Sequence, residues 1–317
     1  MEFIKQLEKT LDTNIIESNS PISWTNTFSL NNEGEIAELR LQDLELSNLV
    51  SLLPIANTVE KLSLVECNLQ NISKIEDFKN LRYLDLDINP FTNLENIQNL
   101  EKLKTLKLAC NNVFSIKALT FLENLTSLDL ESSHNLNFKK IDLEFPSLKS
   151  LSMGGNELLS IENVPYSENL EFLDLNACNL SYFTNKNPFK NLERLDLMCN
   201  EIKEIKNLDS FKKLKKIRLH SCEFQEISKE INFLTSLESL DLGDNHIEEI
   251  KNIDNLINLR ELNLSENEIS KIEGIENLTN LEYVLFAGNK VENIDDVPFE
   301  LRSKIKLSHL IPTTIGV

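Results

Sequence analysis

The chain has few of the residues from which catalytic and metal-binding sites are usually built. Only 7 glycines, 4 histidines and 5 cysteines occur among its 317 residues. It contains no G-x-x-x-x-G-K-[ST] phosphate loop, no H-E-x-x-H pair, no C-x-x-C spacing and no D-x-D-x-D-G calcium loop. The sequence therefore predicts a protein that is not an enzyme and that needs no metal or other cofactor.

Long apolar segments are also missing. No run of apolar residues approaches the roughly 20 that a helix needs to cross a lipid bilayer. The first residues, MEFIKQLEKTLD, lack the basic stretch, apolar stretch and small-residue cleavage site of a secretory signal. We therefore expect no membrane span, no export and a cytoplasmic location.

Basic residues are outnumbered. The chain has 32 lysines and arginines against 51 aspartates and glutamates, a formal net charge of −19 at pH 7. An acidic surface repels phosphate backbones and anionic lipids, so nucleic-acid and membrane binding are disfavoured. The charge favours a protein partner with a basic or mixed-charge surface. The alternative is that it only keeps the chain soluble.

What the chain has in abundance is internal repetition. Segments that begin at Leu192, Leu237 and Leu259 read LERLDLMCNEI, LESLDLGDNHI and LRELNLSENEI. The pattern L-x-x-L-x-L-x-x-N-x-[LI] recurs twelve times, about every 22 residues. The repeats begin at Ile36, Val59, Leu81, Leu103, Leu125, Leu148, Leu170, Leu192, Leu214, Leu237, Leu259 and Leu281.

Each repeat predicts two structural parts. The alternation around L-x-L predicts a short strand with polar residues on one side, and successive strands stack in parallel because each repeat adds one coil. The Asn at position nine turns the chain inward, and its amide can bond main-chain groups of the neighbouring turn. Farther along, apolar residues recur every third position, as at Ile269, Ile272, Ile275 and Leu278, which fits 3₁₀ turns or extended segments.

This pattern resembles the leucine-rich repeat family, and its length is similar to the repeats of bacterial internalins and of a eukaryotic regulator of protein phosphatase 1. The resemblance implies an α/β solenoid, a leucine-rich repeat horseshoe with a parallel β-sheet on the concave face and 3₁₀ or extended segments on the convex face. It also implies that another protein binds to the concave face. The segment from FIKQLEKTL through Trp24 to NNEGEIAELRLQDL resembles the entry to the repeats in bacterial Roco proteins.

Three parts of the chain are expected. Residues 1–35 form an N-terminal cap that begins with a short amphipathic helix, and Trp24 is more plausible there as a plug than as a binding aromatic. Residues 36–300 form twelve repeats, and residues 301–317 form a C-terminal cap. The cysteines follow the repeat register, three at position nine and two at position eight, which predicts free thiols in a reducing compartment.

The outward positions three, five and seven of each repeat supply the candidate partner-binding residues. An acidic group consists of Tyr83, Asp85, Asp87 and Ile88, and Asp129 and Glu131 are further carboxylates of the same face. A central group consists of Phe172, Asp174, Asn176, Arg194, Asp196, Met198, Lys216, Arg218 and His220. Tyr283 is the candidate partner-binding residue of a third location, near the end of the repeats. An exposed aromatic and a methionine among mixed charges are typical of binding hot spots.

Other interpretations of these residues remain open. Strand propensity alone can place aromatics there, arginines can simply pair with neighbouring aspartates, and paired carboxylates can serve acid–base chemistry or calcium binding. For the whole chain, we expect a non-enzymatic protein–protein interaction scaffold. The alternatives are a regulatory subunit of a protein phosphatase and an exported, internalin-like adhesin.

Overall fold

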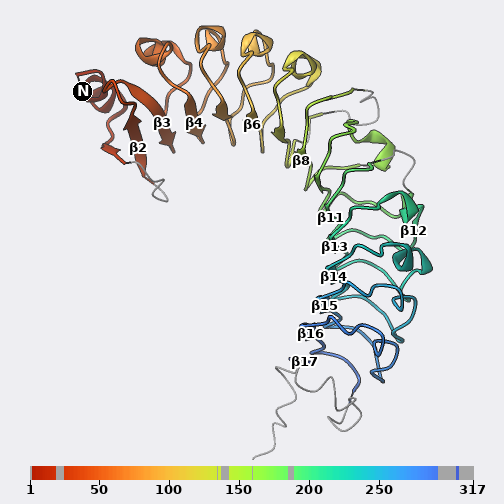
Figure 1. The fold of residues 1–317 in the computed structure, drawn as a ribbon. Coiled ribbons are helices and arrows are strands. Elements are labelled where there is room, and N and C mark those ends of the chain that lie inside the picture. The colour runs from red at the N-terminus through yellow and green to blue at the C-terminus, as the bar shows by residue number, and fades with distance from the viewer. Residues whose placement is uncertain are drawn as a thin grey trace, which may run out of the picture. The chain divides into compact units, whose positions relative to one another are not determined.

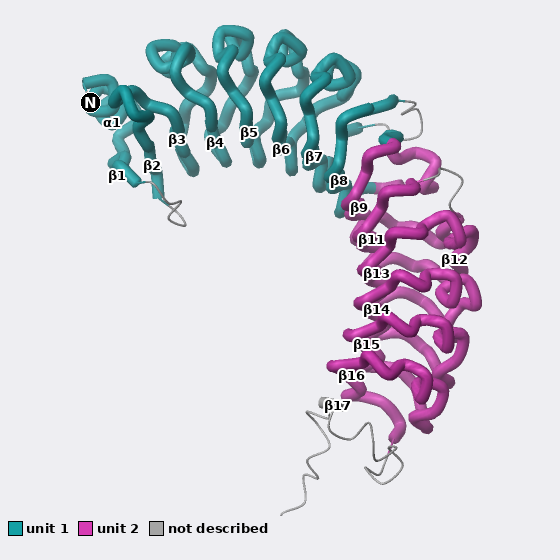
Figure 2. The backbone as a smooth tube through the Cα atoms, viewed as in Figure 1, with its two compact units in different colours: residues 1–156, 165–167 teal, residues 157–164, 168–317 magenta. Residues whose placement is uncertain are grey.

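The computed structural model describes residues 2–18, 25–133, 135–136, 143–158, 160–184, 189–291 and 305–306. The chain divides into two compact units (Figure 2). Unit 1 contains residues 1–156 and 165–167, and unit 2 contains residues 157–164 and 168–317. Within the described part of the chain, no helix combines the length and the apolar character that crossing a bilayer requires.

Unit 1 begins with elements that precede the repeats. Helix α1 (Glu2–Leu11) buries Ile4 and Leu7, as its amphipathic pattern predicts. Strand β1 (Ile15–Glu17) pairs in parallel with β2 (Asn26–Leu30), and β2 pairs antiparallel with β3 (Ile36–Gln42), the first repeat strand. The sequence did not predict this antiparallel pair. Trp24 lies outside the described residues.

The repeat strands of unit 1 pair in parallel, each with the next. After β3 come β4 (Lys61–Val65), β5 (Tyr83–Asp85), β6 (Thr105–Lys107), β7 (Ser127–Asp129) and β8 (Ser150–Ser152). Residues at the same position of successive repeats face each other, so Lys61 stands beside Tyr83 and Tyr83 beside Thr105. A side chain on one strand therefore has its lateral neighbours one repeat away in sequence.

Unit 2 continues the same pattern. Its parallel strands are β9 (Phe172–Asp174), β11 (Arg194–Asp196), β13 (Lys216–Arg218), β14 (Ser239–Asp241), β15 (Glu261–Asn263), β16 (Tyr283–Leu285) and β17 (Ile305–Lys306). A second, two-stranded parallel sheet joins β10 (Phe183–Thr184) to β12 (Ile205–Lys206). Apart from β17, the predicted C-terminal cap at 301–317 lies outside the described residues.

In each unit, 3₁₀ segments occupy the side opposite the repeat strands (Figure 1). They are η1 (Val50–Ile55), η2 (Ile75–Asp77), η3 (Ile97–Asn99), η4 (Lys117–Phe121), η6 (Ile161–Asn163), η7 (Leu208–Ser210) and η8 (Lys229–Phe233). Between the two sides, the repeating leucines and isoleucines are buried, among them Leu84 and Leu86. The predicted solenoid of parallel strands and 3₁₀ segments is confirmed.

The asparagine at position nine bonds main-chain groups of the preceding turn, as predicted, and of its own turn. Nδ2 of Asn89 donates to the carbonyl oxygens of Leu64 and Leu86, at 2.8 and 2.9 Å. Its Oδ1 accepts from the main-chain N–H groups of Cys67 and Leu69, at 3.1 and 3.0 Å. Asn89 is buried, so these bonds satisfy main-chain groups that water cannot reach.

Position eight of every repeat is left-handed, which the sequence did not reveal. Its residues have φ between 50° and 73°: Asp43, Glu66, Ile88, Cys110, Ser132, Gly155, Ala177, Cys199, Ser221, Asp244, Glu266 and Gly288. Only two of the twelve are glycine, although glycine alone adopts this conformation without steric cost. The tight turn is therefore held by main-chain bonds to the next repeat, such as the one from the N–H of Ile88 to the carbonyl of Ala109, rather than by local preference.

Candidate functional site

The nine central residues come together on three consecutive strands of unit 2. They form three rows, since β9, β11 and β13 pair in register. The first row is Phe172, Arg194 and Lys216, the second is Asp174, Asp196 and Arg218, and the third is Asn176, Met198 and His220. We call these nine residues the central patch.

The first row carries the most accessible side chains of the central patch. Arg194 and Lys216 are exposed and stand directly opposite each other, and Phe172 is half-buried beside Arg194. Within the described residues, neither Arg194 nor Lys216 forms an ion pair. The charged groups of Arg194 and Lys216 are therefore available to a partner, next to the aromatic ring of Phe172.

The second row is held by internal bonds. Nη1 of Arg218 donates to Oδ2 of Asp196 at 2.7 Å, and Nδ2 of Asn176 donates to Oδ1 of Asp174 at 2.8 Å. Asp196 is only 6% exposed, and this burial raises the pKa of its carboxyl group. The expectation that arginines pair with neighbouring aspartates thus holds for Arg218 but not for Arg194.

The third row includes the imidazole of His220, whose Nδ1 lies 3.5 Å from Oδ1 of Asp241. A Cβ atom at Gly243 would come within 2.5 Å of that Nδ1. The missing side chain of Gly243 therefore leaves the space that His220 occupies. Met198 is half-buried next to it in the row, so the third row offers a mixed apolar and polar surface.

Aspartates at position five have a structural role that was not predicted from the sequence. Their Oδ1 accepts a hydrogen bond from the main-chain N–H group two residues later, which closes a local turn. The bonds run to Asp85 from Asp87, to Asp129 from Glu131, to Asp174 from Asn176, to Asp196 from Met198 and to Asp241 from Gly243. These five aspartates are thus part of the turns that end their strands.

The acidic group of unit 1 is also internally bonded. Oδ2 of Asp85 lies 3.2 Å from the hydroxyl of Tyr83 and 3.3 Å from Oγ of Ser63. Oδ1 of Asp87 accepts from the main-chain N–H of Ala109 at 2.8 Å, and Nζ of Lys107 lies 3.9 Å from Oδ2 of Asp87. The structure therefore brings Tyr83, Asp85 and Asp87 together, with Lys107 as their cation.

Burial governs the protonation of this group. It raises the pKa of Asp87 to about 7, with a further contribution from the negative charge of Asp85. Burial likewise raises the pKa of the Tyr83 phenol. A carboxyl group that titrates near neutral pH is a candidate acid or base. Among the described residues, no cluster of three or more metal-ligating side chains is present, here or elsewhere.

The remaining predicted residues lie apart from these two groups. Asp129 and Glu131 belong to β7 and the turn after it, and β6 separates them from Tyr83. Tyr283 is half-buried on β16 beside Glu261, and β14 and β15 separate it from the central patch. The predicted residues thus divide among several places on the strands.

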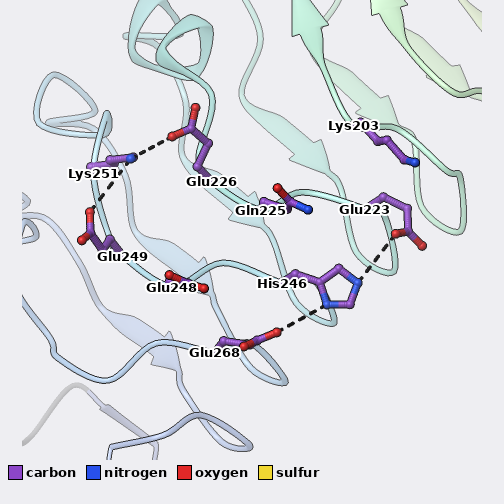
Figure 3. Close-up of a pocket in the computed structure, with 9 residues that line it drawn as sticks. All are labelled: Lys203, Glu223, Gln225, Glu226, His246, Glu248, Glu249, Lys251 and Glu268. Atoms are coloured by element: carbon purple, nitrogen blue, oxygen red, sulfur yellow. Dashed lines mark ion pairs between the residues drawn. The ribbon is translucent and has the colours of Figure 1, made fainter.

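A side groove in unit 2 was not predicted (Figure 3). Its volume is about 930 Å³, and it is lined by Lys203, Glu223, Gln225, Glu226, His246, Glu248, Glu249, Lys251 and Glu268. The imidazole of His246 lies between Glu223 and Glu268, at 3.7 and 3.8 Å, and Lys251 lies 2.8 Å from Glu226. The sequence does contain a pattern that could have predicted these ion pairs, because position ten of successive repeats is Glu223, His246, Glu268 and Lys290.

Comparison with protein families identifies the repeats. A family model described as "Leucine Rich repeats (2 copies)" matches residues 257–299, and a "Leucine Rich repeat" model matches residues 233–248. No curated protein matches the chain in sequence.

Three solved structures show the same fold. A leucine-rich repeat protein of Leptospira interrogans has a TM-score of 0.70 and 26% identity, with 86% of this chain and 72% of that one covered. The internalin inlF of Listeria monocytogenes has a TM-score of 0.62 and 22% identity, with 86% of each chain covered. The leucine-rich repeat domain of APL1B has a TM-score of 0.57 and 22% identity, with 73% of this chain and 69% of that one covered.

Proposed function

We propose that the chain, whose repeats match leucine-rich repeat models at residues 233–248 and 257–299, is a non-enzymatic scaffold that binds another protein through the outward side chains of its strands. The observation that carries the proposal is the first row of the central patch. There an aromatic ring and two unpaired cations face outward on neighbouring strands. Aromatic and arginine side chains are the most frequent hot-spot residues of protein interfaces.

The extent of the strands suits a protein partner. The seven described strands in the main sheet of unit 2 lie about 4.8 Å apart and so span roughly 30 Å. A standard interface buries about 800 Å² on each partner. A small molecule would instead favour an enclosed, largely apolar pocket. The side groove is lined by charged and polar residues only, so it does not have that character.

The carboxylates of the strands support a binding role over catalysis. Most of them already accept hydrogen bonds from the main chain, as Asp174, Asp196 and Asp241 do. The net charge of −19 supports a partner with a basic or mixed-charge surface rather than a nucleic acid or an anionic membrane. All five cysteines are free, which supports a cytoplasmic location as part of the proposal.

Affinity capture tests the proposal. The purified chain is immobilised, exposed to extract of its own cells, and the retained proteins are identified by mass spectrometry. We expect a specific protein that the wild-type chain retains and that Phe172→Glu loses. Phe114→Glu is the matched control, since Phe114 is 63% exposed and lies in unit 1, just before η4. Retention by Phe172→Glu together with loss by Phe114→Glu would contradict binding at the central patch.

One observation favours a second candidate, an exported adhesin: the likeness to the internalin covers 86% of both chains. Immunoblots of cytosolic, membrane and secreted fractions separate the two proposals, because an adhesin would appear outside the cytosol. The phosphatase-regulator alternative makes a different prediction in the capture experiment. A phosphatase catalytic subunit would be the retained protein, and its activity would change when the chain is added.

A further inference from the structure

We propose that the central patch binds an acidic peptide segment, which lies across Arg194 and Lys216. The inference rests on the proposed function and deepens it, because it specifies the partner's chemistry at this place. It gives a mixed-charge partner a defined acidic part, whereas the overall charge of the chain alone would favour a basic one.

The starting point is the register of β11 and β13. Arg194 and Lys216 are direct cross-strand neighbours, both exposed. Like charges in this arrangement destabilise a sheet. Several cations instead pair with an acid one repeat away, among them Lys61 with Glu38, Arg82 with Glu60, Lys215 with Glu193, Arg218 with Asp196 and Arg260 with Glu282. With 51 acidic residues against 32 basic ones, a neutral or acidic neighbour would be the ordinary outcome.

More cations lie immediately beside this pair. The segment FKKLKKIR at 211–218 contains Lys212, Lys213, Lys215, Lys216 and Arg218 and no acidic residue. The first three line an open groove of about 580 Å³, together with Arg260, two carboxylates and three polar side chains: Glu193, Glu238, Ser236, Asn258 and Asn280. Two of them have partners: Nζ of Lys213 donates to Asn191 at 2.7 Å and Nζ of Lys215 to Glu193 at 2.9 Å.

The cations of this segment and Arg194 together form what we call the basic track, which runs past the carboxylates of Glu193 and Glu238 in the groove. Within the described residues, Lys212, Lys216 and Arg194 form no ion pair. At the end of the first row, Phe172 adds an aromatic ring next to Arg194. This order fits a segment whose carboxylates follow the cations and whose apolar side chain contacts Phe172.

The surroundings favour a peptide over a nucleic acid. Asp174 and Asp196 form the next row of the same three strands, and the whole chain carries −19. A phosphate backbone brings a dense, regularly spaced charge that would meet these aspartates as well. An acidic peptide can place its carboxylates on the cations and direct its other side chains toward the remaining rows.

Fluorescence anisotropy tests the inference with a short fluorescein-labelled peptide of alternating glutamate and glycine. We expect the wild-type chain to bind it at low ionic strength and to release it as salt is added. The double variant Arg194→Glu/Lys216→Glu should bind about tenfold more weakly, since two favourable contacts become repulsive. The control Lys229→Glu/Lys271→Glu changes the net charge equally at exposed residues of unit 2, and its affinity should stay within about twofold of wild type.

Several results would overturn the inference. They are no binding of the glutamate peptide by the wild-type chain, equal weakening in the control variant, or tighter binding of a matching lysine–glycine peptide. Single-stranded DNA that binds more tightly than the peptide, with the same loss in Arg194→Glu/Lys216→Glu, would identify a nucleic-acid site instead. Circular dichroism of each variant confirms that the fold is retained.

Failure of the inference and failure of the proposed function give different results. If Phe172→Glu loses the captured protein while the glutamate peptide never binds, only the acidic segment is wrong. If the peptide binds as expected but the capture experiment retains no protein, the scaffold function fails and the anion-binding track remains.

Discussion

At the scale of single residues, burial moves the pKa of the Asp87 carboxyl group from the acidic range to near neutral pH. Its native pKa of about 7 lies above the ordinary value of 3.8, so the folded chain binds a proton that the unfolded chain releases between these values. The unfolding free energy should therefore fall as pH rises from about 4 to about 7 and stay level above that.

The substitution Asp87→Asn removes this dependence. Asn cannot ionise, and its Oδ1 can still accept the hydrogen bond from the N–H of Ala109. We expect the variant to match wild type near pH 4 and to be more stable at pH 8, by about 2–4 kcal/mol. Urea denaturation of both proteins across this pH range measures the difference. A difference that does not change with pH would contradict the assignment to Asp87.

A second residue-scale prediction concerns the cations of the first row. Lys216→Glu places a carboxylate directly opposite Arg194, so repulsion is replaced by attraction. We expect the variant to be more stable by about 0.2–1 kcal/mol and yet to bind the glutamate peptide more weakly. Thermal unfolding and anisotropy, performed on the same preparation, measure both effects. Loss of stability with unchanged binding would argue that the pair serves the sheet alone.

At the scale of the repeat element, the asparagine ladder joins each turn to the previous one. Asn89→Ala removes the side-chain partner of the N–H groups of Cys67 and Leu69 and of the carbonyl of Leu64, whereas the carbonyl of Leu86 still accepts from Nδ2 of Asn111. Buried groups without partners are costly, and we expect a loss of about 3–5 kcal/mol.

Two further variants isolate the cause of that loss. Asn93→Ala is the control at an exposed asparagine, and its effect should stay within about 0.5 kcal/mol. Asn89→Cys should fall between, because Sγ of Cys67 and of Cys222 already contacts main-chain carbonyls at this position. Equal losses in the alanine and cysteine variants of Asn89 would show that the thiol contributes nothing there.

The same scale shows what could be predicted from the sequence. Strands, 3₁₀ segments and the asparagine ladder were predicted correctly, since twelve copies of one pattern average out the irregularities of any single copy. The left-handed residue at position eight was missed because Ile88, Cys110 and Ala177 have no local preference for it. It is imposed by the bonds on either side of the turn, which one repeat considered alone does not contain.

The candidate site was predicted less completely than the fold. Outward positions followed from strand alternation, and the register then placed Phe172, Arg194 and Lys216 in one row. The hydrogen bond from the N–H of Met198 to Asp196, which makes that aspartate structural, depends on the turn geometry. The side groove around His246 depends on side chains at position ten, outside the strand columns from which the site was predicted.

At the scale of the whole molecule, each unit contains at least one buried cysteine, so thiol labelling can follow the unfolding of each unit separately. Cys67 is buried in unit 1, whereas Cys178 and Cys222 are buried in unit 2. Burial raises the pKa of the Cys67 and Cys222 thiols to about 12, which suppresses the reactive thiolate. The other two, Cys110 and Cys199, are exposed.

Labelling with N-ethylmaleimide tests this distribution. In the native chain we expect Cys110 and Cys199 to react rapidly and the three buried thiols to be protected. Peptide mass spectrometry after brief labelling at increasing urea then gives one unfolding curve for Cys67 and another for Cys178 and Cys222. Equal labelling rates for all five thiols without denaturant would contradict the burial of the position-nine cysteines.

The parallel register makes neighbours of residues that lie 22 or 23 positions apart, as Lys61 and Glu38 do. Gain or loss of one whole repeat therefore preserves the leucine core while it exchanges partners across the outward rows. Deletion of residues 214–236 would set Arg194 opposite Ser239 and Asp196 opposite Asp241. During the evolution of such a repeat protein, duplication or deletion of one repeat would change the partner-binding surface in a single step. Substitutions that restore a lost cross-strand pair would then occur one repeat length away in sequence.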